Sequence, residues 1–347
     1  MNPITLTMMY SMIFLGPMIV FTSSHWLTTW IGFEMNLMAI IPLMMTKKTP
    51  RSTEAAAKYF MTQASASMIL MFAIILNFTL YSQWNMNMKL NSISSCLLTT
   101  SMLMKLGMAP FHFWMPEVTQ GMTLSTGMIL LTWQKLAPLS IMYQILPSMN
   151  HQLILTSALL SIMIGGWGGL NQLQLRKILA YSSISHMGWM MAVLTYNPTL
   201  TTLNLTIYII ITLTMFMYLK CYKIKTTSML SQMWNINITF TIMMSLVLLS
   251  LGGLPPLTGF MPKWLIIQEL TKNNNIILPT LMAMMSLINL MFYTRLIYLS
   301  SMTMLPTTTP SKLKWHHKTP KTNIMMPTLS TLSILLMPLT PTFIILT

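Results

Sequence analysis

The sequence contains very few charged residues. Asp, Glu, Lys and Arg make up 7% of the 347 residues, Asp does not occur at all, and hydrophobic residues make up 54%. Soluble domains carry about 25% charged residues, which keep their surfaces in contact with water. A water-soluble protein is therefore excluded, and the composition indicates a protein that crosses a membrane several times.

Cysteine is almost as scarce. Cys96 and Cys221 are the only two, far apart and each within apolar sequence. They exclude a disulfide framework and leave too few thiolates for an iron–sulfur or zinc site built by this chain. The sequence also lacks a nucleotide-binding fingerprint, a serine triad and the spacing typical of metal ligands. We therefore expect no metal and no redox cofactor in this chain.

Long apolar runs are abundant, and a run of about 20 residues crosses about 30 Å of hydrocarbon as a helix. Eleven runs fall near residues 3–22, 25–45, 58–81, 95–114, 123–146, 151–170, 175–196, 199–219, 238–270, 276–300 and 324–345. The first lacks the basic start and cleavage site of a signal peptide, so we expect it to be retained. The sequence thus predicts an all-α polytopic membrane protein with about 11 transmembrane helices.

The shortage of acidic residues leaves a net charge of +15, which in a soluble protein would suggest nucleic acid as a partner. Counted over alternate loops, one side of the membrane holds thirteen Lys or Arg residues, and the other holds only Lys89 and Lys272. This asymmetry follows the positive-inside rule. It predicts an N-terminus on the basic side and a C-terminus on the other, with the charge anchoring loops to lipid headgroups.

Two apolar segments are interrupted in the same way. Lys105-Leu-Gly-Met-Ala-Pro-Phe-His-Phe-Trp-Met-Pro-Glu117 and Leu251–Lys263 share the spacing Leu-Gly-x-x-Pro, followed by Met-Pro. Proline removes a backbone donor and clashes with the preceding turn, so both helices should break. A break at membrane depth is tolerated where it is buried or lines a wet cavity. Broken helices in corresponding halves are typical of transporters built from repeats.

The two broken segments lie five crossings apart, so they run in opposite directions and the repeat is inverted. We predict one membrane domain over 1–347, made of a first inverted repeat over 1–146, a second over 151–300, a basic loop over 301–323 and a C-terminal helix over 324–347. The glycine-rich stretch over 165–169 ends an apolar run and is not followed by Lys-Ser/Thr. We interpret it as a site of close helix packing.

Four ionisable side chains lie well inside apolar runs: Glu34, Lys105, Lys135 and Lys263. Each costs at least about 2.5–3.5 kcal/mol at the centre of a spanning helix. The structural alternative for the lysines is snorkelling toward the nearest interface, and for Glu34 it is an ion pair that only ties two helices together. Glu117 and Glu269 fall toward span ends, where we expect them to be solvated.

The functional interpretation of the four buried groups is a proton relay. Burial disfavours a charged lysine, whereas a nearby carboxylate favours it. A change in the distance between Glu34 and Lys105 would therefore switch Lys105 between holding and releasing a proton. Lys135 has no acidic neighbour in the sequence, so we expect it to release its proton more readily than Lys105 and to pass it through water toward Lys263.

His112 and His186 are possible further members of the relay. His112 lies in the first broken segment, and His186 follows a run of hydroxyl side chains that includes Ser182 and Ser185. A lone histidine among aromatic residues is more often a packed, hydrogen-bonded residue. The hydroxyl run favours His186, because its side chains and a water molecule could carry a proton.

Three motifs carry a resemblance to a known family: Lys105–Glu117, Gly252-Gly-Leu-Pro-Pro-Leu-Thr-Gly-Phe-Met-Pro-Lys263 and Arg176-Lys-Ile-Leu-Ala-Tyr-Ser-Ser-Ile-Ser-His-Met-Gly188. With them the chain resembles the antiporter-like subunits of respiratory complex I, the NADH:ubiquinone oxidoreductase of mitochondria, over essentially its whole length. The 42 Met residues resemble the composition of mammalian proteins encoded in mitochondrial DNA, whose code reads an extra codon as Met.

The resemblance implies a Glu–Lys pair at Glu34 and Lys105, a central lysine at Lys135 and a terminal lysine at Lys263. It implies proton translocation across the inner mitochondrial membrane, coupled to NADH oxidation and ubiquinone reduction, with the basic loops facing the matrix. NAD, FMN, iron–sulfur clusters and ubiquinone would bind to other subunits. The implied partners are neighbouring antiporter-like subunits, small membrane subunits, accessory subunits and phospholipids. Relatives usually carry fourteen helices, and this chain starts at the position of the fourth.

Two alternatives to a complex I subunit remain open. A stand-alone cation/proton antiporter would share this fold and its buried lysines, but it would exchange ions without partners. A purely structural membrane subunit would hold its neighbours together and use its charges only for packing. An unchanged proton stoichiometry after Lys135→Met would favour the structural alternative.

Overall fold

The computed structural model describes residues 2–86, 90–302, 325–340 and 342. These residues are almost entirely helical, and none of them forms a strand beyond two isolated bridges, His25 with Asn85 and Gln174 with Thr226. The chain divides into two compact units, Met1–Ser161 and Ile162–Thr347. The predicted basic loop over 301–323 lies, from residue 303 onward, outside the described residues.

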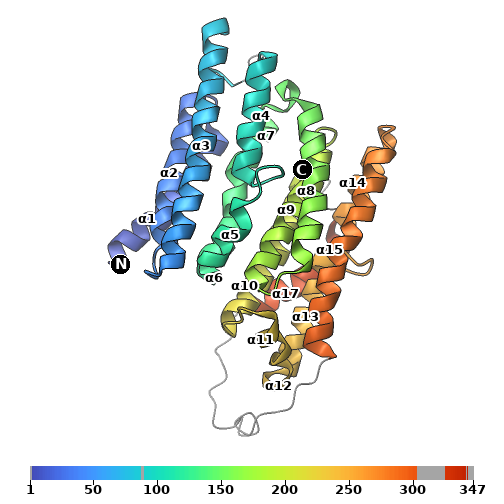
Figure 1. Ribbon diagram of the computed structural model, residues 1–347. Coiled ribbons are helices and arrows are strands. Elements are labelled where there is room, and N and C mark those ends of the chain that lie inside the picture. The colour runs from blue at the N-terminus through green and yellow to red at the C-terminus, as the bar shows by residue number, and fades with distance from the viewer. Residues whose placement is uncertain (1, 87–89, 303–324, 341, 343–347) are drawn as a thin grey trace. The chain divides into compact units, whose positions relative to one another are not determined.

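The first unit occupies the blue to green part of the ribbon (Figure 1). Its helices are α1 (Pro3–Thr22), α2 (Trp26–Met44), α3 (Pro50–Tyr81), α4 (Ser92–Leu106), α5 (Trp114–Gly121), α6 (Leu124–Leu131) and α7 (Leu136–Gln144), with the 3₁₀ turns η1 (Trp133–Lys135) and η2 (Leu146–Ser148). α2 packs against α1 and α3, and α3 packs against α4 and α5.

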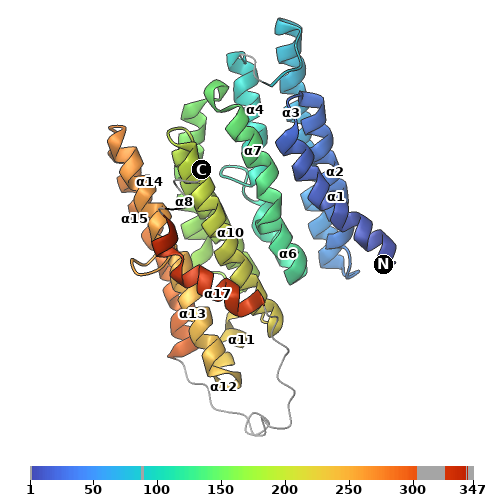
Figure 2. The same ribbon diagram turned by 180° about the vertical axis from the view of Figure 1, so that it is seen from behind.

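The second unit begins within α8. Its helices are α8 (His151–Leu170), α9 (Leu175–Leu194), α10 (Pro198–Cys221), α11 (Thr227–Ser231), α12 (Met233–Ile236), α13 (Ile238–Gly252), α14 (Phe260–Lys272), α15 (Ile277–Ser301) and α17 (Met325–Leu335), with the turn η4 (Met337–Leu339). α10 packs against α9, and α17 contacts both α10 and α13 (Figure 2). α17 and η4 account for the described part of the predicted C-terminal helix.

Six of the described helices are long and apolar enough to cross a membrane: α1, α2, α3, α8, α10 and α15. Each coincides with one of the predicted apolar runs, and α9 coincides with another. The remaining runs are divided into shorter helices by turns. The prediction of an all-helical protein with several membrane spans is therefore confirmed.

Both predicted helix breaks are present. α4 ends at Gly107, whose φ of 69° is left-handed, and α5 begins at Trp114. α13 ends in the same way at Gly253, with a φ of 80°, and α14 begins at Phe260. Glycine adopts this conformation at little cost because it has no Cβ. The second cap is thus Gly253, one residue after Gly252, which the sequence spacing aligned with Gly107.

A third break lies in the run over 123–146, which we predicted as one span. α6 ends at Leu131, the next residues form the η1 turn, and α7 begins at Leu136. Pro138 explains the break, because its ring would clash with the carbonyl of Gln134 in a continuous helix. Lys135 therefore lies at the junction of two short helices and not on the side of one long helix.

The glycine-rich stretch in α8 is a site of close packing, as predicted. A Cβ added at Gly168 would overlap the ring of Tyr181 on α9, and a Cβ at Gly169 would come within 2.9 Å of the ring of Phe292 on α15. A larger residue at either position would push the neighbouring helix away. Glycine thus lets the end of α8 approach both α9 and α15.

Candidate functional site

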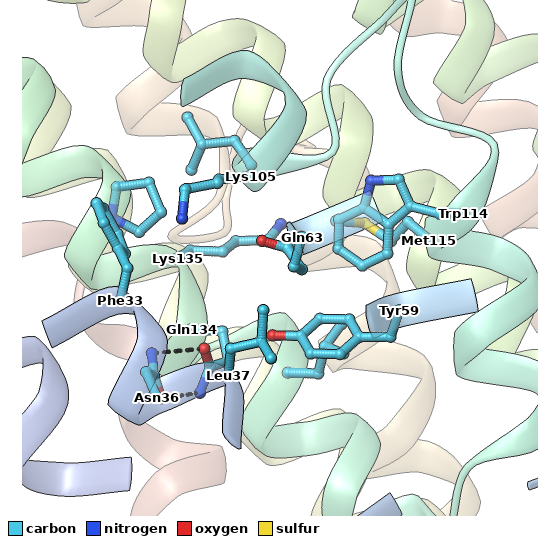
Figure 3. Close-up of a pocket in the computed structure, with 13 residues that line it drawn as sticks. Phe33, Asn36, Leu37, Tyr59, Gln63, Lys105, Trp114, Met115, Gln134 and Lys135 are labelled. Carbon is cyan, nitrogen blue, oxygen red and sulfur yellow. Dashed lines mark hydrogen bonds between the residues drawn. The ribbon is translucent and has the colours of Figure 1, made fainter. Parts of the chain in front are cut away.

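A cavity of about 30 Å³ lies inside the first unit, where α2, α3, α4, α5 and the η1 turn meet (Figure 3). The residues that line it are Phe33, Asn36, Leu37, Tyr59, Gln63, Lys105, Leu106, Trp114, Met115, Leu130, Gln134, Lys135 and Pro138. A cavity needs about 10–15 Å³ by this measure to hold one water molecule, so this one has room for about two.

Lys105 enters the cavity from the last turn of α4, and its side chain is only 9% exposed. Its ammonium group lies over the ring of Phe33 on α2, with Nζ 3.9 Å from the ring centroid. The negative face of an aromatic ring attracts a cation at this distance. The C-terminal end of α4 adds a partial negative charge nearby. The ring and the helix end therefore both stabilise the charged form of Lys105 without an ion pair.

Glu34, the predicted partner of Lys105, follows Phe33 directly on α2 and is partly buried. The two groups are nevertheless not joined as an ion pair, because the pairs within 4.0 Å among the described residues are Lys58–Glu54, Lys58–Glu117 and Lys272–Glu269.

Lys135 reaches the same cavity from the η1 turn, and its side chain is 4% exposed. Figure 3 shows the side chain of Lys105 above that of Lys135, which lies level with Gln63 and above Leu37. The two lysines are 30 positions apart in the sequence and come from different elements. The structure thus brings together two of the four predicted relay groups within one unit.

Sequence reasoning missed the amide pair that fixes the η1 turn. Asn36 Nδ2 donates to Gln134 Oε1 at 2.7 Å, and Gln134 Nε2 donates to Asn36 Oδ1 at 2.7 Å (Figure 3). Trp133 Nε1 donates to the carbonyl of Ile13 on α1 at 2.9 Å. The turn is therefore held to α1 and α2 through the two residues that precede Lys135. The signal in the sequence was Asn36 itself, an amide two residues after Glu34 in a mostly apolar run.

A second, smaller cavity lies in the second unit and measures about 10 Å³. It is lined by His186 and Trp189 from α9, Asn204, Ile207, Tyr208 and Ile211 from α10, and Gly259, Pro262 and Lys263 at the start of α14. His186, at 8% exposure, packs its ring against that of Tyr208 with centroids 5.5 Å apart. The structure thus brings His186 and Lys263 together, and it adds Asn204 and Tyr208.

Lys263 caps the helix on the other side of its own break. Its Nζ donates to the carbonyl of Gly252 at 2.7 Å, in the last turn of α13, where carbonyls lack partners within the helix. Trp189 Nε1 and Asn204 Nδ2, which line the same cavity, are buried and donate to no protein acceptor. A water molecule in a cavity of this size would accept from such donors.

His112 is not brought to either cavity. It lies in the turn between α4 and α5, where its Nδ1 is 3.2 Å from the carbonyl of Pro110 and its ring centroid is 4.2 Å from that of Phe113. It is buried, at 5% exposure. In this position it packs the turn, which is the structural alternative considered for it above.

The remaining carboxylates lie away from both cavities. Glu117 binds Lys58 at 2.5 Å, and Glu269 binds Lys272 at 3.4 Å, with side-chain exposures of 52% and 22%. Within the described residues, no three His, Cys, Asp or Glu side chains lie close enough together to hold a metal ion. The absence of a cofactor in this chain stays a prediction.

Comparison with known proteins identifies the family of the chain. The family model described as NADH:quinone oxidoreductase/Mrp antiporter, TM matches residues 23–289, and NADH dehydrogenase subunit 2 C-terminus matches residues 290–344. NADH-ubiquinone oxidoreductase chain 2 of Suncus etruscus is 61% identical over 100% of both chains, and that of Ovis aries is 60% identical over 98% of both. The chain belongs to the NADH-ubiquinone oxidoreductase chain 2 family. The resemblance read from the three motifs is confirmed.

Two solved structures have a fold similar to that of this chain 2 family member. A chain of respiratory complex I from Thermus thermophilus superposes with a TM-score of 0.81 at 22% identity, covering 97% of this chain and 80% of the other. A chain of the Mrp complex from Dietzia sp. DQ12-45-1b gives 0.84 at 15% identity, covering 96% and 74%. The antiporter-like fold is therefore shared well beyond the sequence relatives.

Proposed function

We propose that this chain is a proton-translocating membrane subunit of NADH:ubiquinone oxidoreductase, working in the inner mitochondrial membrane. Its membership of the chain 2 family and its several apolar helices support this. The observation that carries the proposal is that Lys105 and Lys135, both buried, line one cavity with room for water. Amine groups joined by water are able to exchange protons, because an ammonium group is able to lose its proton.

The shared cavity couples the protonation of the two lysines. Two ammonium groups around so small a volume repel each other, so the pair favours one proton over two. In a transfer step the ammonium group of one lysine gives a proton to a cavity water, and that water gives a proton to the neutral amine of the other. Lysine suits this role because, unlike arginine, it is able to lose its proton.

Glu34 would control which lysine holds the proton. Its carboxylate lies on the same helix as Phe33, whose ring already holds the Lys105 ammonium group. A small movement of α2 relative to α4 would change the distance from Glu34 to Lys105 and with it the stability of the charged form. We infer that such a movement drives the transfer from Lys105 to Lys135.

The cavity of the second unit would be a further site where protons pass between side chains through water. Lys263 and His186 line it together with two buried donors that have no protein acceptor, Trp189 Nε1 and Asn204 Nδ2. A water molecule there would connect the Lys263 amine to the His186 imidazole, and both of these groups are able to bind and release a proton. We place His112 outside the relay.

Redox chemistry would take place elsewhere in the complex. We infer that NAD, FMN, iron–sulfur clusters and ubiquinone bind to other subunits, since the two cysteines of this chain are isolated. Its partners would be antiporter-like, small membrane and accessory subunits. The thirteen basic residues of one set of loops support an N-terminus and basic loops in the matrix and a C-terminus in the intermembrane space.

The likeness to the Mrp complex favours one second candidate, a stand-alone cation/proton antiporter. Partner dependence separates the two functions. The isolated chain in phospholipid vesicles should exchange no ions across the membrane if it works only within the complex. Ion exchange by the chain alone would support the antiporter.

The proposal is tested by Lys105→Met in the intact complex, reconstituted into vesicles. We expect the number of protons moved per NADH oxidised to fall while the complex remains assembled. Lys272→Met is the matched control, because Lys272 is 61% exposed and lines neither cavity. An assembled Lys105→Met complex with the normal proton ratio would contradict the role of the cavity.

A further inference from the structure

A groove of about 510 Å³ opens on the second unit, away from the two cavities described above. Its lining residues are Leu170 at the end of α8 and Met291, Phe292, Thr294, Arg295 and Tyr298 on α15. Met291 and Tyr298 are 64% and 61% exposed, so the groove faces outward. Apart from Arg295 and two hydroxyl groups, its walls are apolar.

Arg295 lies in the predicted apolar run over 276–300 and was not among the four buried charges named from the sequence. Its guanidinium group donates to the carbonyls of Leu170 and Gln172, the latter at 3.0 Å, where α8 ends and its carbonyls lack helical partners. Its Nε is buried and donates to no acceptor. The two carbonyls are neutral, so they hold the guanidinium group in place without balancing its charge.

The second unit supplies no carboxylate side chain for Arg295. Glu269 is the only Asp or Glu between residues 162 and 347, and it binds Lys272. Within the described residues no acidic group lies within 4.0 Å of Arg295. A cation on an apolar groove in a membrane protein is costly without a counter-charge. We therefore expect an anion from outside this unit to balance the charge of Arg295.

The position of the groove along the membrane indicates which anion fits. Arg295 lies six residues before the end of α15 at Ser301, or about 9 Å at 1.5 Å per residue. Tyr298 on α15 and Trp167 on α8 are exposed, at 61% and 76%. Exposed Tyr and Trp residues are typical of the headgroup level of a bilayer. One end of the groove thus lies near headgroup phosphates, and the other end, at Met291, extends toward the hydrocarbon.

We propose that this groove binds a phospholipid, with the phosphate on Arg295 and an acyl chain along Met291 and Phe292. Guanidinium groups bind phosphate through paired hydrogen bonds, and Tyr298, one turn further toward the headgroups, adds a hydroxyl donor. A helix about 10 Å across fills roughly 400 Å³ per turn, so the groove would hold little more than one turn of a partner helix. A single acyl chain is narrower than a helix and fits a groove of this size better.

The test uses the whole complex, purified in detergent, with its bound phospholipid measured by phosphorus assay and mass spectrometry and the groove examined in a high-resolution map. In the unaltered complex we expect elongated lipid density that ends at Arg295. Met291→Trp should remove that density and lower the bound phospholipid, because indole fills the groove without touching the guanidinium group. Arg295→Met should do the same if the end of α8 tolerates the loss of its cap.

Lys272→Met serves as the control for loss of positive charge and should leave the bound phospholipid unchanged. A carboxylate from another subunit on Arg295 in the map would overturn the proposal, and so would normal lipid content and density in the Met291→Trp complex. None of these measurements depends on proton pumping, so the outcome is independent of the function proposed above.

Discussion

The side chains of Asn36 on α2 and Gln134 in the η1 turn donate hydrogen bonds to each other, each 2.7 Å long. The pair lies in the wall of the cavity that Lys105 and Lys135 share. It joins the turn that carries Lys135 to the helix that carries Glu34. Residues next to both lysines of the cavity are thus linked to α2, Lys105 through the Phe33 ring and the neighbour of Lys135 through Asn36.

Asn36 and Gln134 should contribute to stability jointly, so that the effects of replacing them are not additive. Asn36→Leu leaves the partly buried Gln134 amide without its partner, and an unpaired buried amide costs up to about 1–3 kcal/mol. Replacing both residues by Leu removes both polar groups, so the double variant should lose less than the sum of the two single variants. Thermal unfolding of the assembled complex measures the three changes. Fully additive losses would mean that the two amides stabilise the site independently.

The cap at Gly253 should control the position of Lys263. A Cβ at Gly253 would lie 2.7 Å from Lys263 Nζ and would force a strained left-handed residue, whereas a Cβ at Gly252 meets only ordinary contacts at 3.5 Å and beyond. A non-glycine residue in the left-handed conformation costs about 1–2 kcal/mol. Gly253→Ala should therefore lower proton pumping and stability, and the neighbouring Gly252→Ala should leave both nearly unchanged. Equal effects of the two substitutions would contradict this assignment.

Glu34→Gln should keep the fold and impair the relay. The amide occupies the same space as the carboxylate, but it carries no negative charge that would favour a protonated Lys105. We expect fewer protons pumped per NADH in an assembled complex. Glu117→Gln, at a carboxylate that is 52% exposed and lines neither cavity, is the matched control. A normal proton ratio in the Glu34→Gln complex would show that Glu34 is only structural.

Lysine labelling tests the orientation within the second unit. Lys223 and Lys225 are exposed beside the end of α10, and Lys272 is exposed at the end of α14. In mitochondria whose outer membrane alone is opened, an impermeant amine reagent should label Lys272. Lys223 and Lys225 should react only after the inner membrane is opened as well. The reverse pattern would show that the basic loops face the intermembrane space.

Local signals account for what the sequence predicted correctly. Gly107 and Pro110, like Gly253 and Pro255, mark the two broken helices because glycine and proline restrict the backbone at the place where they occur. The long apolar runs likewise gave α1, α2, α8, α10 and α15 with small errors at their ends, and α3 except for its first eight residues from Pro50. Each buried lysine was visible as a charge in apolar sequence.

Contacts between distant parts of the chain account for what was missed. The meeting of Lys105 and Lys135 in one cavity depends on the packing of α4 against α7, which directly follows the η1 turn, and no sequence spacing reveals this packing. The η1 turn itself depends on the Asn36–Gln134 pair as well as on Pro138. Arg295 was overlooked because it lies near the end of a long apolar run, where its two carbonyl acceptors come from another helix.

The central claim is that Lys135 works by gaining and losing a proton, and the Lys135→Arg complex tests it most directly. Arginine keeps the positive charge but does not release it near neutral pH. The measurement is the number of protons moved per NADH oxidised in vesicles, beside Lys135→Met and the control Lys272→Arg. The account predicts assembled complexes in which Arg and Met at position 135 impair pumping to a similar degree. A normal proton ratio in the Lys135→Arg complex would contradict it, because a fixed positive charge would then be enough.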